Sequence, residues 1–108
     1  MAGPTNKYTI HFPADFDGRD EFEMPSRGYF NGVVVEFSDG TRHPLSFIDP
    51  ARLAYEAQAD FADGGTYFAE PNMVVLPRVT PASIRAAIDD MVQGNFFQEL
   101  KAHDPAAA

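Results

Sequence analysis

The fold is decided by residues 33–50, VVVEFSDGTRHPLSFIDP. Apolar and polar residues alternate on both sides of Asp39-Gly40, which is the pattern of a half-buried β-hairpin. A three-residue turn with Gly40 in the left-handed region pairs Val33 with Leu45, whereas a two-residue turn would move Leu45 to the opposite face of the sheet. The sequence therefore predicts a bulged hairpin whose apolar side chains share one face.

A helix is predicted directly after this hairpin. Asp49 is a good N-cap, and Pro50 suits the first helical position because its missing N–H would have no partner there. Apolar residues then recur at helical spacing until Gly64, which favours the end of a helix. We therefore expect a strand–turn–strand–helix unit.

The same order recurs further along the chain. Residues 66–69 and 73–76 are typical of two strands around a turn, and Thr80-Pro81 begins a second helix with the same cap and proline. Residues 8–12 alternate as a further strand. The predicted fold is α+β: a two-layer sandwich in which an antiparallel sheet of four or five strands carries two helices on one face, built as tandem ββα-ββα units.

The length and composition of the chain exclude several classes of function. The chain has 108 residues, which suits a single α+β domain over residues 1–108, with frayed termini expected at 1–6 and 102–108. Sixteen acidic and eight basic residues give a net charge of −8, which argues against direct binding of nucleic acid or of an anionic membrane. The chain has no cysteine, which excludes disulfides, thiolate metal sites and cysteine nucleophiles. No secretory signal or bilayer-length apolar run is visible, so we expect a cytoplasmic protein.

The second predicted hairpin carries apolar side chains on both faces. Phe68 and Met73 would lie on one face, and Tyr67 and Val74 on the other. A sheet that is apolar on both faces needs a cover on both. The amino-terminal segment, the carboxyl-terminal tail or a second copy of the chain could supply it, and with the second copy we expect a homodimer.

The most unusual stretch is residues 15–23, which hold five carboxylates and one arginine in nine residues. A calcium loop of the EF-hand type does not fit this segment. With Gly18 at the invariant glycine position, Pro13 and Met24 would occupy the first and last ligand positions, and neither side chain carries a carboxylate.

We expect this acidic segment to be a solvated loop or hairpin that turns at Asp17-Gly18, with Phe16 and Phe22 tucked inward. Such a loop could dock onto a basic surface of a partner protein. The candidate partner-binding residues are Asp15, Asp17, Asp20, Glu21 and Glu23.

Two histidines are candidates for catalytic chemistry. His11 is predicted on the polar side of the first strand, and His43 on the apolar side, opposite Val35. Together with Glu36 they would form a speculative pocket if the fold brought them together. The histidines lack metal-ligand spacing, the serines lack a nucleophile elbow, and no glycine-rich phosphate loop is present. We therefore expect no catalytic residue, no metal and no cofactor.

Ten phenylalanines and four tyrosines give the chain a high aromatic content. Core packing accounts for most of them, because a small domain needs large side chains to bury enough area. Four are harder to place inside and are candidates for an aromatic interface: Tyr29, Phe30, Phe96 and Phe97.

These observations favour a small, acidic, non-catalytic protein-interaction module that forms a homodimer. One alternative is a small-molecule-binding protein or a small enzyme, with its pocket between sheet and helices or at a dimer seam. A further alternative is an acidic inhibitor or immunity-type protein that blocks a basic active site.

Overall fold

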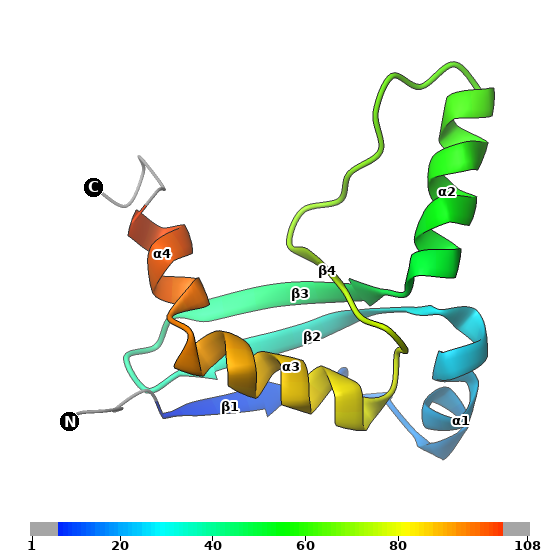
Figure 1. The fold of residues 1–108 in the computed structure, drawn as a ribbon. Helices are drawn as coiled ribbons and strands as arrows, with labels where there is room; N and C mark the ends of the chain where they lie inside the picture. The colour runs from blue at the N-terminus through cyan, green and yellow to red at the C-terminus, as the bar shows by residue number, and fades with distance from the viewer. Residues whose placement is uncertain (1–6, 103–108) are drawn as a thin grey trace.

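The computed structural model describes residues 7–102, with the side chains of residues 7–99, and these form four strands and four helices (Figure 1). In chain order the elements are β1 (Tyr8–His11), α1 (Gly18–Arg27), β2 (Tyr29–Phe37), β3 (Arg42–Ile48), α2 (Pro50–Ala62), β4 (Met73–Val75), α3 (Pro81–Gln93) and α4 (Phe96–Ala102). The α+β class is therefore confirmed. The predicted frayed ends at 1–6 and 102–108 lie outside the described residues, apart from Ala102 at the end of α4.

The sheet has the strand order β1-β2-β3-β4 and is mixed. The β1–β2 and β2–β3 pairs are antiparallel, whereas β3 and β4 are parallel. The expectation of a purely antiparallel sheet was wrong, because residues 66–69 form no strand and cannot reverse the chain before β4. Residues 49–72 instead form a crossover that contains α2 and returns the chain in the direction of β3.

The central hairpin has the predicted register. Val33 pairs with Leu45 and Val35 pairs with His43, and Gly40 has a φ of 91°. The turn is closed by the Gly40 N–H, which donates to the Phe37 carbonyl oxygen at 2.9 Å. The three-residue turn is therefore confirmed, and it places the apolar residues of both strands on one face.

Both predicted helix starts are also confirmed. The Asp49 carboxylate accepts a hydrogen bond from the Arg52 backbone N–H at 2.7 Å, with Pro50 as the first residue of α2. Thr80 caps α3 in the same way through the Ser83 N–H at 3.0 Å. Each cap supplies a partner for an N–H that the helix itself leaves unpaired.

The hydrophobic core lies between the sheet and α3. The inward residues of the central strands are almost fully buried, and they pack with the apolar stripe of α3 and with Phe97 of α4. Figure 1 shows α3 lying alongside β1 and β2. The sheet side of this core consists of Val33, Val35, Leu45 and Phe47, and the α3 side consists of Ile84, Ile88 and Val92.

Helix α2 does not share this core. It has no buried residue, and Figure 1 shows it projecting away from the sheet. The predicted arrangement of both helices on one face is thus not found, and neither are tandem ββα units, because α1 precedes the hairpin and 66–69 is not a strand. Helical spacing of apolar residues predicted α2 correctly, but spacing does not specify which surface a helix meets.

Most of the acidic segment, residues 18–23, forms the first part of helix α1, and residues 15–17 lead into it. Asp17 is the N-cap: its carboxylate accepts from the Asp20 N–H at 3.0 Å, and the Asp20 carboxylate accepts from the Asp17 N–H at 3.2 Å. This reciprocal capping box starts a helix at Gly18, where we expected a turn. Gly28, with a φ of 68°, ends the helix.

Candidate functional site

The five candidate carboxylates lie on or just before α1, and most of them have partners within it. Asp17 and Asp20 are occupied with the capping box. Glu23 accepts from the Arg19 Nε at 3.2 Å and also pairs with Arg27. Asp15 and Glu21 are exposed. The segment therefore presents less unpaired charge than its composition indicates.

Phe22 lies on the solvent side of this acidic helix. Its side chain is 84% exposed, whereas Met24 is only 1% exposed. Two residues along a helix are about 200° apart, so a helix that buries Met24 turns Phe22 outward. The expectation that Phe22 is tucked inward was wrong for this reason. Phe16, by contrast, packs against the core, with ring contacts to Phe12 and Phe30.

The four candidate interface aromatics do not form one surface. Tyr29 and Phe30 are partly buried, and Phe96 is 43% exposed. Phe97 is 4% exposed and belongs to the core, where its ring centroid lies 4.8 Å from that of His43 and 5.4 Å from that of Phe37. Phe97 is thus a core residue, and its side chain is not available for a surface contact.

The speculative pocket is brought together only in part. His11 and Glu36 meet, with 2.8 Å between His11 Nε2 and Glu36 Oε1, and Arg42 Nη1 donates to the same oxygen at 3.0 Å. His43 pairs with the buried Val35, next to Glu36 along β2, and therefore lies on the core face of the sheet. The structure thus separates His43 from the other two residues.

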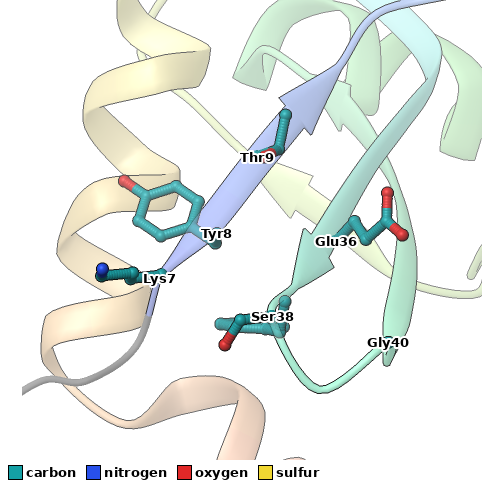
Figure 2. A pocket seen from close by; sticks show the side chains of 7 residues that line it. Lys7, Tyr8, Thr9, Glu36, Ser38 and Gly40 are labelled. Atoms are coloured by element: carbon teal, nitrogen blue, oxygen red, sulfur yellow. The ribbon is translucent and has the colours of Figure 1, made fainter.

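A hollow of about 330 Å³ opens at the start of β1, beside the β2–β3 turn. It is lined by Lys7, Tyr8, Thr9, Glu36, Phe37, Ser38 and Gly40. Figure 2 shows the Tyr8 ring and the Glu36 carboxylate pointing to opposite sides of β1. Chemistry on a bound molecule needs polar groups that converge on one point, and the Tyr8 hydroxyl and the Glu36 carboxylate do not converge (Figure 2).

Two tyrosines have pKa values raised above the usual value. Burial raises the pKa of Tyr8, and Asp89, which accepts from the Tyr8 hydroxyl at 2.9 Å, raises it further. Burial likewise raises the pKa of Tyr29, with a contribution from the nearby Glu70 carboxylate. Both shifts favour the neutral form of the phenol. The hydrogen bond from the Tyr8 hydroxyl to Asp89 also connects β1 to α3.

Three exposed large apolar side chains lie on α2 and the segment that follows it. Tyr55 is 68% exposed, Phe61 is 50% exposed, and Tyr67 in the return segment is 72% exposed. The sequence showed the helical spacing of the apolar residues, but it contained no signal that this stripe would face solvent. A helix of this length is marginal alone in water, so its exposure is an unusual feature.

The base of α2 is held firmly to the body. Asp49 donates its backbone N–H to the Gly28 carbonyl oxygen at 2.9 Å, and Arg52 Nη1 donates to the Arg27 carbonyl oxygen at 3.0 Å. The Arg52 guanidinium also lies 5.9 Å from the centre of the Tyr29 ring. The projection of α2 is therefore fixed by specific contacts at the helix start.

No protein-family model, curated protein or solved structure matches this chain. Within residues 7–102, no group of three or more His, Asp or Glu side chains is placed to hold a metal ion. Among the described helices, none has the length and apolarity needed to cross a membrane.

Proposed function

We propose that this chain is a non-catalytic protein-interaction module that works as a homodimer. The observation that carries the proposal is α2, a thirteen-residue helix without a single buried residue. Apolar side chains that protrude from a folded body are stabilised when a partner removes them from water. Tyr55 and Phe61, both at least half exposed, are the large side chains that gain most from such a contact.

The placement of the polar residues supports a binding role over a catalytic one. Catalysis by proton transfer requires an acid or base aimed at a shared space. In the His11–Glu36–Arg42 cluster, one Glu36 oxygen contacts the His11 ring nitrogen and accepts from Arg42 on a partly exposed face, and His43 lies against Phe37 and Phe97 on the other face. These groups stabilise the sheet, and they leave the exposed α2 surface as the stronger feature.

The homodimer is tested by size-exclusion chromatography with light scattering over a concentration series. We expect the mass to rise from 11.9 kDa for one chain towards twice that value as concentration increases. A mass that stays at one chain up to about 200 μM would contradict the homodimer, because a pair with a micromolar dissociation constant is largely assembled at that concentration.

A second surface favours a basic partner protein. Phe22 projects from α1, and the exposed Glu21 precedes it in the same helix turn, so an apolar anchor and a carboxylate are both presented by this turn. An enzyme with a basic active site, blocked by this helix, is one form that such a partner could take. The test is affinity capture with the wild-type chain, Phe22→Ser and Glu21→Lys side by side. A partner retained equally by all three would not bind at α1.

A further inference from the structure

We propose that α2 pairs antiparallel with α2 of a second copy, along a seam formed by Ala51, Ala54, Gln58 and Phe61. This inference rests on the proposed homodimer and specifies its contact surface. The four residues are all exposed, and their spacing of three, four and three residues is that of the facing positions in paired helices. At about 100° per residue they fall within an arc of about 80° on one side of α2.

The charged residues of α2 lie on the opposite side of the helix. Arg52, Glu56 and Asp60 follow one another at intervals of four residues, and the Arg52 Nε donates to Glu56 Oε2 at 2.6 Å. The seam itself contains no charged side chain, although the chain carries a net charge of −8. Two copies of an acidic protein repel each other over most of their surface, so an uncharged stripe is where they can meet.

The lack of charged side chains in the seam favours a second copy over a basic partner of the kind proposed for α1. A basic surface gains from carboxylates that it can neutralise, and this seam offers it none. A second copy needs only a surface that is complementary to itself, as any two-fold contact does.

The side-chain sizes along the seam favour the antiparallel direction. Small residues, Ala51 and Ala54, occupy the first half of α2, and the large Phe61 lies near its end. An antiparallel pair with Ala54 opposite Gln58 places each Phe61 against the Ala51 of the other copy. A parallel pair would set Phe61 against Phe61 and leave a gap between the alanines, which is a poorer use of the same area.

The positions of the two folded bodies also favour antiparallel pairing of the helices. Each α2 is attached to its body at the Pro50 end and projects away from it (Figure 1). Antiparallel pairing keeps the two acidic bodies at opposite ends of a helix pair about 20 Å long. Parallel pairing would bring the two bodies side by side. The antiparallel pair also sets opposite helix dipoles next to each other.

The size of the seam sets the expected strength. Thirteen residues of helix cover less than the roughly 800 Å² per partner of a standard interface. We therefore expect a dissociation constant in the micromolar range. Experiments on the pair accordingly need protein concentrations of tens to hundreds of micromolar.

Disulfide trapping tests both the surface and the direction, because the chain has no cysteine of its own. Ala54→Cys and Gln58→Cys chains, one of them carrying a mass tag, are mixed and oxidised. Facing Cα atoms of two close-packed helices are about 4–6 Å apart, within disulfide reach. In the antiparallel register, like residues are offset by about 6 Å more along the axis, so we expect the mixed disulfide to form at least about tenfold faster than either like pair.

Ala86→Cys is the matched control for random collision, because Ala86 is an exposed alanine on α3. Preferential like-with-like disulfides would overturn the antiparallel direction. Disulfide rates no higher than the Ala86→Cys rate, in a chain that light scattering shows to be a dimer, would overturn the seam and leave the homodimer intact. A monomer by light scattering would overturn the homodimer and the seam together.

A second pair of variants tests the seam without cross-linking. Ala54→Glu puts a carboxylate into each half of the contact and is expected to raise the dissociation constant at least about tenfold. Ala59→Glu adds the same charge at an exposed position of α2 outside the seam, and we expect it to dimerise like the wild type. Equal weakening by both variants would overturn the proposed surface, since both add one carboxylate to the same helix.

Discussion

Gly28 is the position at which one added methyl group has the largest consequence for the joint between α1 and α2. Its φ of 68° is in the left-handed region, and a Cβ there would lie 2.7 Å from Asp49 Oδ2. The Asp49 carboxylate cannot move away freely, because it caps α2 through the Arg52 N–H. Gly28→Ala therefore combines backbone strain with loss of a helix cap.

The expected magnitude follows from these two costs. Left-handed backbone costs an alanine about 1–2 kcal/mol, and loss of the Asp49 cap costs about 0.5–2 kcal/mol. We expect Gly28→Ala to lower the free energy of unfolding by about 1.5–4 kcal/mol. Gly40→Ala is the matched control, because Gly40 has a φ of 91° with open space around its Cβ position, so only strain applies.

The assay is urea unfolding at one fixed protein concentration, followed by circular dichroism, for Gly28→Ala, Gly40→Ala, Asp49→Ala and the double variant of Gly28 and Asp49. Once Asp49 is shortened, the clash is gone and the cap is lost only once. The double variant should therefore be more stable than additivity predicts by the cost of the cap, about 0.5–2 kcal/mol. Strict additivity, or equal losses for Gly28→Ala and Gly40→Ala, would refute the claim that the α1–α2 joint depends on this close approach.

Three further changes have defined expected outcomes. Phe47→Ala removes a fully buried ring from the core and should cost about 3–5 kcal/mol in urea unfolding; a loss below about 1 kcal/mol would place Phe47 outside the core. Asp17→Ala removes the cap of α1 and should cost about 1 kcal/mol, while Asp15→Ala, as its control, should cost almost nothing. The raised pKa of Tyr8 contributes stability that is present below pH 10 and lost as the pH rises through the folded value. Wild type should therefore lose more stability than Tyr8→Phe between pH 8 and pH 11, and parallel pH profiles would contradict that shift.

The parts of the fold that depend on neighbouring residues were predictable from the sequence. The register of the β2–β3 hairpin follows from alternation and from the conformation that Gly40 permits. The starts of α2 and α3 follow from Asp49 and Thr80, which satisfy backbone groups within three residues of themselves.

The start of α1 was predictable in principle but was missed. Asp17 and Asp20 have the spacing of a capping box, whereas the Asp17-Gly18 pair taken alone is typical of a turn. The wrong expectation that Phe22 points inward has the same origin. Once α1 is a helix that buries Met24, the side chain two residues earlier is turned to solvent.

The remaining errors concern contacts between distant residues. The parallel pairing of β4 with β3 joins Phe47 to Val74 across the whole crossover, and no local pattern encodes that choice. Similarly, the apolar spacing of α2 is the same whether the helix covers its own sheet or projects from it.

The sequence predicted His11 and Glu36 as members of one cluster, but Arg42, which donates to the same Glu36 oxygen, was not among the expected residues.

The crossover of residues 49–72 has a consequence for how the chain assembles. The β1, β2 and β3 strands are contiguous enough to pair early, but α3, which supplies half of the core, lies beyond the crossover. Closing a long loop costs conformational entropy before any distant contact repays it, and such contacts slow folding. We therefore expect an early three-stranded sheet with an uncovered apolar face, and a later step in which β4 docks and α3 closes over that face. During that interval the apolar face of the sheet is uncovered, and the chain is most exposed to aggregation.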